Sequence, residues 1–131
     1  MNAAYQQYKM VTIQTASPGK LVLLMYEGAL VALDAAKKSL LEGREEAAHA
    51  SILKAQDIIS ELLIALDSRG GKVAECLGAL YEFMKSTLVE ANIQKDVKKV
   101  EVVASLLQGL HSAWAEMLKR YNHAPTAETL I

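Results

Sequence analysis

Hydrophobic residues recur every three or four positions along most of the chain, a spacing that predicts amphipathic helices. One stripe runs through Ala48, Ile52, Ala55, Ile59, Leu62 and Leu66. A second runs through Val73, Leu77, Leu80, Met84, Leu88 and Ala91, and a third through Val100, Val103, Leu107, Leu110, Trp114, Met117 and Tyr121. Because side chains with this spacing share one face of a helix, each helix is expected to bury that face against its neighbours.

Capping residues predict where these helices begin and end. Ser17-Pro18 is typical of a helix start, with a serine cap before a proline in the first turn. Gly43 is typical of a helix end, and Asp96 can cap the start of the last helix. The helices are expected at about residues 18–42, 45–66, 72–92 and 97–121.

Short connections between helices of about twenty residues place successive helices antiparallel. The expected fold is therefore all-α, an antiparallel up-down-up-down four-helix bundle over residues 17–121. Residues 1–16 are expected to form a short N-terminal capping arm, and residues 122–131 a flexible C-terminal tail.

The first helix is apolar around most of its circumference. Its stretch LVLLMYEGALVAL, residues 21–33, contains Glu27 as its one charged residue. Around the whole helix, Lys20, Glu27, Asp34 and Lys38 fall on one narrow stripe. Since no helix of a four-helix bundle is surrounded by the others, additional cover is expected for this one, and the arm is the candidate.

Composition narrows the class of protein. The 131 residues are 52% hydrophobic with a net charge of −1, which excludes a disordered chain and gives no indication of nucleic-acid or membrane-surface binding. No apolar run approaches the roughly 18 residues that cross a bilayer, and the N-terminus lacks the order of a secretory signal. The lone cysteine, Cys76, suits a reducing compartment, so a cytosolic protein is expected.

No set of residues predicts catalysis or metal binding. Glu46-Ala-Ala-His49 matches one half of a di-iron site, but the other helical histidine, His111, follows Gln108 in place of a glutamate. His49 lacks the nearby glycine of a phosphotransfer histidine, and both histidines are expected to be exposed. We therefore expect no catalytic residue, metal or cofactor. A phosphorelay module and a self-associating bundle remain the alternative interpretations.

Several large apolar residues fall outside the predicted core stripes. They are Leu53 and Ile64 on the second helix, and Phe83, Val89 and Ile93 on the third. Single exposed aliphatic side chains are common on soluble proteins. Together, however, these five favour a surface that binds an apolar, helical partner.

Ordered motifs along nearly the whole chain resemble the flagellin-specific export chaperones of the FliS family. They are Tyr5-x-x-Tyr8, Thr15-Ala-Ser-Pro18, LVLLMYEGAL, KAQDII, LD followed by GG, LYEFM, EAN and EVVASLLQGLHSAWAEM. Cys76 departs from the usual pattern, as does Glu27, which stands for the usual aspartate before Gly28.

The resemblance implies a bacterial cytosolic chaperone that binds the disordered C-terminal segment of flagellin, prevents premature polymerisation and delivers it to the flagellar type III export gate. It also implies an N-terminal lid, with Tyr5 and Tyr8, that the client displaces. It allows an anti-sigma factor or a co-chaperone as a further partner. The client contacts are expected at Leu53, Ile64, Phe83, Val89 and Ile93, in a monomer or weak dimer.

Overall fold

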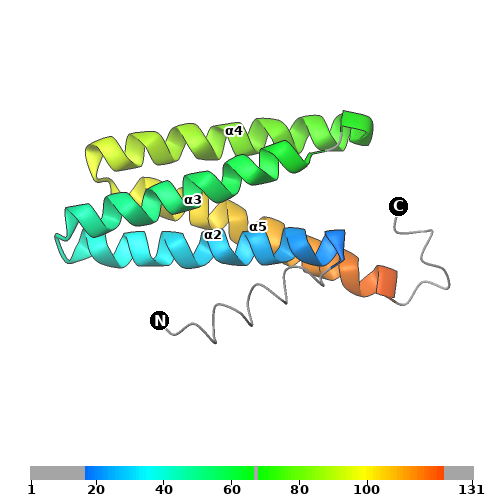
Figure 1. Cartoon of the computed structure of the whole chain (residues 1–131), viewed down its shortest axis with the longest axis horizontal. Helices are drawn as coiled ribbons and strands as arrows, with labels where there is room; N and C mark the ends of the chain where they lie inside the picture. The colour runs from blue at the N-terminus through cyan, green and yellow to red at the C-terminus, as the bar shows by residue number, and fades with distance from the viewer. Residues whose placement is uncertain (1–16, 67, 123–131) are drawn as a thin grey trace.

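The computed structural model describes residues 17–66 and 68–122, which form four long helices and one short 3-10 turn (Figure 1). The elements are α2 (Pro18–Leu41), α3 (Glu45–Ala65), η1 (Ser68–Gly70), α4 (Gly71–Gln94) and α5 (Val97–Asn122). Each helix packs against its neighbours in sequence, and α5 closes the ring against α2. The predicted all-α antiparallel four-helix bundle is confirmed. The predicted arm, residues 1–16, and residues 123–131 of the predicted tail lie outside the described residues.

The helix ends follow the capping signals in the sequence. The Ser17 hydroxyl accepts a hydrogen bond from the Lys20 backbone N–H at 3.2 Å, and Pro18 occupies the first turn. At the other end of α2, Gly43 has a φ of +72°, and the Arg44 N–H donates to the Ser39 carbonyl at 2.8 Å. This closure is the Schellman motif, in which a glycine adopts the left-handed conformation that other residues avoid.

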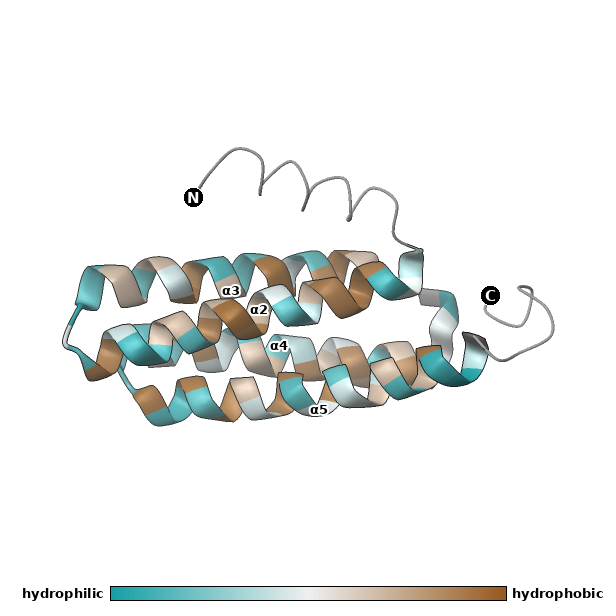
Figure 2. Cartoon of the chain, turned by 90° about the horizontal axis from the view of Figure 1, so that it is seen from below, coloured by the Kyte–Doolittle hydropathy of each residue, from teal (hydrophilic) through white to brown (hydrophobic). Residues whose placement is uncertain are grey.

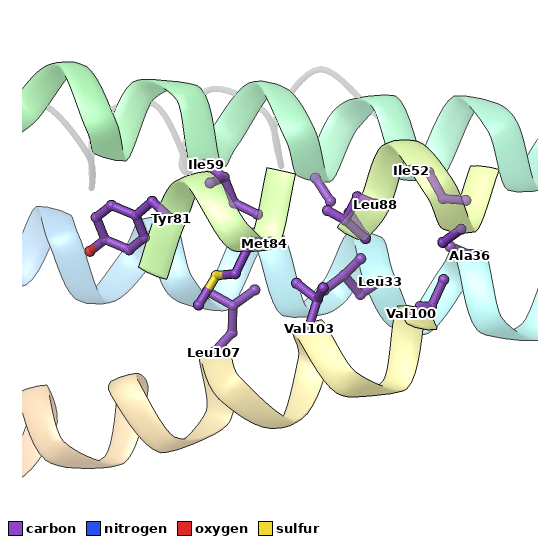
Figure 3. Packing of buried hydrophobic residues seen from close by; sticks show 14 of the residues in the cluster. Leu33, Ala36, Ile52, Ile59, Tyr81, Met84, Leu88, Val100, Val103 and Leu107 are labelled. Atoms are coloured by element: carbon purple, nitrogen blue, oxygen red, sulfur yellow. The ribbon is translucent and has the colours of Figure 1, made fainter. Parts of the chain in front are cut away.

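One continuous apolar core runs along the bundle. Side chains from all four helices fill it, including Leu33, Ile59, Met84, Val103 and Leu107, which point into the shared interior (Figure 3). Five of the six stripe residues predicted on α3 are buried, and the sixth, Leu66, packs against the core.

The predicted stripes fail at the ends of the bundle. Val73 and Tyr121 fall on the expected apolar faces but are exposed, at 69% and 37% of their surface. Val73 lies in the first turn of α4 and Tyr121 in the last turn of α5. A side chain in a terminal turn has neighbouring helices on fewer sides, so periodicity alone overestimates its burial.

The first helix packs extensively against two partners. The α2–α3 and α2–α5 interfaces are the most extensive between any helices of the bundle. On α2, Leu23, Tyr26, Ala29 and Leu33 are buried, while Val22, Met25 and Leu30 pack against the core from its flanks. In Figure 2 hydrophobic colour accordingly extends over much of α2. Packing on two sides accounts for most of the apolar circumference of this helix.

A pair of tyrosines joins the two helices that lie diagonally across the bundle. The hydroxyl groups of Tyr26 on α2 and Tyr81 on α4 are 2.6 Å apart, and both side chains are almost fully buried. Burial raises the pKa of both phenols, because the charged phenolate would be poorly solvated there. Each hydroxyl therefore stays protonated and depends on the other for its hydrogen bond.

None of the described helices has a stretch long and apolar enough to cross a membrane.

Removing one hydroxyl of the tyrosine pair should destabilise the bundle, because the other hydroxyl is left buried without a partner. We expect Tyr26→Phe and Tyr81→Phe each to lower the free energy of unfolding by about 1–3 kcal/mol in urea titrations. The double variant should lose clearly less than the sum of the two losses. Additive losses would contradict this account of the pair.

Candidate partner-binding surface

The five predicted contact residues are all exposed. The exposed fraction of the residue's surface is 43% for Leu53, 76% for Ile64, 51% for Phe83, 44% for Val89 and 78% for Ile93. None of them belongs to the core cluster or packs against it. Their apolar surface is therefore available for a partner, although their role in binding stays a prediction.

Four of these residues lie on α3 and the neighbouring part of α4. A hydrogen bond of 2.8 Å between Asn92 Nδ2 and His49 Nδ1 sets the relative height of the two antiparallel helices. Leu53 follows His49 by one turn, and Val89 precedes Asn92 by about one turn. Leu53 and Val89 therefore lie at one level, on either side of the α3–α4 interface.

The remaining two extend this surface outward. Ile93 follows Val89 by one turn of α4, and Ile64 lies on the same side of α3 as Leu53, about three turns farther on. Leu53, Ile64, Val89 and Ile93 are together called the α3–α4 face. Leu53, Val89 and Ile93 thus lie close together in height on two adjacent helices, and Ile64 lies farther along α3.

Phe83 is separate from the α3–α4 face. It precedes Glu90 by seven residues and so shares its side of α4. Glu90 pairs with Lys99 of α5 at 3.6 Å, which shows that this side faces α5. The structure therefore places the exposed Phe83 on the side of α4 that faces α5, and not with the other four predicted residues.

Sequence reasoning missed a hollow between α2 and α5, helices that lie side by side in Figure 1. Its volume is about 420 Å³. Leu30 and Leu33 of α2 and Val100 and Ala104 of α5 form its apolar lining, while Asp34, Ser105 and Gln108 add polar groups. This hollow, called the α2–α5 bay, could not be found from one helix at a time, because each helix supplies only one wall.

A polar side-chain contact crosses between the helices at each end of the bay. Lys37 Nζ lies 3.0 Å from Glu101 Oε2, and His111 Nε2 lies 2.8 Å from Glu27 Oε2. The prediction that His111 is exposed is wrong, because its side chain is only 23% exposed and contacts Glu27. His111 and Glu27 are 84 residues apart in sequence, so no local sequence pattern predicts their contact.

The beginning of α2 is fastened to the last turns of α5. Trp114 Nε1 donates a hydrogen bond of 2.8 Å to the Gly19 carbonyl. Leu118 approaches Gly19 so closely that a Cβ there would lie 2.7 Å from Leu118 Cδ2. The beginning of α2 therefore lies directly beside α5.

The histidine and cysteine side chains form no reactive or metal-binding cluster within residues 17–66 and 68–122. Among these residues, no group of three or more His, Cys, Asp or Glu side chains could hold a metal ion. His49 is exposed, as predicted, and is hydrogen-bonded to Asn92, while Cys76 is exposed. The features that stand out in these residues are the exposed apolar side chains and the α2–α5 bay.

Fold and surface together define an all-helical four-helix protein with apolar side chains on its outer faces. The family model described as "Flagellar protein FliS" matches residues 1–121. The chain belongs to the FliS family of flagellar secretion chaperones, which are not enzymes.

Individual relatives agree with this assignment. The chain is 39% identical to the flagellar secretion chaperone FliSB of Pseudomonas aeruginosa, over 85% of this chain and 92% of that protein. It is 34% identical to the flagellar secretion chaperone FliS of Salmonella typhimurium, over 87% of each chain. The fold also matches a crystal structure described as a flagellar chaperone from bacteria, with a TM-score of 0.75 and 21% sequence identity. The match covers 89% of this chain and 96% of that chain.

Exposed isoleucines should contribute little to stability, in contrast to a buried isoleucine on the same helix. We expect Ile64→Ala and Ile93→Ala each to change the free energy of unfolding by no more than about 0.5 kcal/mol. Ile59→Ala, at a fully buried position of α3, should cost about 2–5 kcal/mol. Chemical denaturation measures the free energy of unfolding of the three variants. A large decrease for Ile64→Ala or Ile93→Ala would show that these side chains stabilise the fold.

Proposed function

We propose that this protein binds the disordered C-terminal segment of flagellin in the bacterial cytosol, prevents its premature polymerisation and delivers it to the flagellar type III export apparatus. The proposal combines membership of a flagellar secretion chaperone family with an apolar outer surface. The export gate is the partner to which the loaded chaperone is delivered. An anti-sigma factor or a co-chaperone is a further partner that the family resemblance allows.

The single observation that carries this proposal is the α3–α4 face. Leu53 and Val89 lie on either side of the α3–α4 interface, Ile93 one turn beyond Val89 and Ile64 about three turns beyond Leu53, all at least 43% exposed. An amphipathic helix can bind across two such helices through apolar side chains spaced three or four residues apart. Phe83, on the other flank of α4, is the contact expected where a longer client segment continues around the bundle.

Binding of a disordered client suits this kind of surface. Coupled folding and binding buries on the order of 1,000–3,000 Å² and forfeits roughly 2–5 kcal/mol to ordering of the client. Several apolar contacts spread over the bundle can offset that cost without a deep, preformed pocket. Wrapping the client also covers the apolar side chains through which flagellin subunits would otherwise associate.

Residues 1–16 act in this proposal as a lid that the client displaces. Tyr5 and Tyr8 supply the aromatic side chains that cover part of the apolar surface in the free chaperone. A lid of this kind reduces self-association of the free protein, which is then a monomer or weak dimer.

Substitutions on the α3–α4 face should weaken client binding without unfolding the bundle. We expect the double variant Leu53→Ser/Val89→Ser to raise the Kd for a labelled flagellin C-terminal peptide at least about tenfold, which corresponds to 1.4 kcal/mol. Fluorescence anisotropy measures the affinity. Circular dichroism confirms that the helix content is unchanged.

Val31→Ser is the matched control, because Val31 is also exposed but lies on α2, diagonally across the bundle from α4. Its affinity for the peptide should equal that of the unaltered protein. Equal weakening by the control and the double variant would refute the assignment of the α3–α4 face. Absence of any binding, with a stable dimer in solution, would favour the self-associating alternative.

A further inference from the structure

We propose that a second copy of this chain docks on the outer side of α4 and α5, with the two copies antiparallel about a two-fold axis. Phe83 lies beside the axis in each copy, and Lys98 of each copy pairs with Glu116 of the other. The inference rests on the proposed function only for its consequence, which concerns the part of the client that reaches Phe83.

Two apolar side chains mark the centre of this surface. Glu90 of α4 pairs with Lys99 of α5 at 3.6 Å, and this contact sets the relative height of the two antiparallel helices. Phe83 lies seven residues before Glu90 and Leu106 seven residues after Lys99, so both are about 10 Å from the ion pair and level with each other. Phe83 is exposed and Leu106 is partly buried.

The surface around these two side chains carries no charge. Residues 102–115 of α5, about four turns, include no Asp, Glu, Lys or Arg. Uncharged residues three to seven positions from Phe83 and Leu106 continue the same sides of α4 and α5, and all of them are exposed. With Phe83 and Leu106 they form the α4–α5 face, which consists of Cys76, Ala79, Phe83, Val102, Leu106 and Gly109. An exposed, uncharged face on two adjacent helices is typical of a surface that another protein covers.

Gly109 indicates that another chain approaches α5 closely. Glycine in the interior of a helix is destabilising relative to alanine, because it loses more conformational freedom on folding. A Cβ added at Gly109 would meet no atom within 4 Å, so no contact within the described part of the chain requires a glycine there. The absence of a side chain at this exposed position lets a second helix approach the α5 backbone.

The charges at the two ends of the face identify the occupant as a second copy. Lys98 and Glu116 lie on the side of α5 that carries Val102 and Gly109, since the four residues are spaced by four and seven positions. Lys98 and Glu116 are about 27 Å apart along the helix, so they cannot meet within one chain. An antiparallel second copy places its Glu116 beside this Lys98 and its Lys98 beside this Glu116. One rotation satisfies both ends, so the face is self-complementary.

The same axis brings the two Phe83 rings together. Position 107 of α5 lies midway between Lys98 and Glu116, and the axis runs across both helices at this level. Measured from the pair of Glu90 and Lys99, this level corresponds to about residue 82 of α4, next to Phe83. Phe83 of each copy therefore meets Phe83 of the other, and aromatic pairs of this kind stabilise an interface beyond the burial of their area.

The second copy and a client on the α3–α4 face do not exclude each other. Phe83 lies on the flank of α4 that faces α5, whereas Val89 lies on the flank towards α3. A client bound at the α3–α4 face therefore leaves the dimer intact. A longer client segment that continues to Phe83 must displace the second copy.

Charge reversal tests the pairing in the full-length protein without client, by analytical ultracentrifugation at low ionic strength. We expect Lys98→Glu and Glu116→Lys each to raise the Kd of the dimer about tenfold, because each places like charges together at both ends of the face. An equimolar mixture of the two variants should restore the Kd of the unaltered protein, because every charge in the mixed pair again faces its opposite. Lys54→Glu, an equal change of charge on α3 diagonally across from α5, is the control and should leave the Kd unchanged.

An unaltered protein that stays monomeric at its highest soluble concentration, or single variants that associate as tightly as the unaltered protein, would overturn the proposal. A mixture that associates no more tightly than either variant alone would also overturn it, as would an equal rise in Kd with Lys54→Glu. Since the experiment contains no client, failure of flagellin binding would leave its outcome unchanged, and the two proposals can fail separately.

Gly109→Gln gives a second measure, which separates association from stability. Glutamine is a better helix former than glycine, so the free energy of unfolding of this variant should be unchanged or higher in urea titrations. Its longer side chain should hold the second copy away from α5 and raise the Kd of the dimer at least about tenfold. Ala50→Gln, at an exposed position of α3, is the matched control. Equal Kd values for the two variants, with both bundles folded by circular dichroism, would contradict the proposal.

Discussion

Packing of α2 against both α3 and α5 is the constraint on which the rest of the structure depends. A helix with two extensive interfaces must be apolar around most of its circumference, and the charges of α2 are accordingly confined to a narrow stripe. The Schellman closure at Gly43 and the contact of Trp114 with Gly19 hold α2 in this position at its two ends. The other helices then surround the interior, with Tyr26 and Tyr81 joined across its middle.

A bundle built in this way leaves apolar surface that its own core does not use. Four helices arranged in a ring bury only their inward faces, so Leu53, Ile64, Val89 and Ile93 remain exposed. Exposed apolar patches of this kind carry a risk of aggregation, and in soluble proteins they commonly mark a surface that binds a partner. In the function proposed here, a client that folds onto the surface gives a direct physical reason for keeping them.

Much of the fold could be predicted because its signals are local. Ser17 with Pro18, Gly43 and Asp96 mark helix ends through contacts within a few residues, and the stripe on α3 depends only on helical periodicity. The pairing of His111 with Glu27 and the α2–α5 bay could not be predicted, because both depend on residues far apart in sequence. Exposure of the five candidate residues followed from their positions off the stripes, but the separation of Phe83 from the others required the relative placement of α4 and α5.

Isothermal titration calorimetry with the C-terminal segment of flagellin from the same genome, at two temperatures, tests the central claim most directly. Burial of apolar surface with folding of the client predicts a tight one-to-one complex with a large negative heat-capacity change. Absence of binding heat at both temperatures, together with no complex on a sizing column, would contradict the account. A one-to-one complex with a heat-capacity change near zero would also contradict it, because the apolar surface would then stay in contact with water.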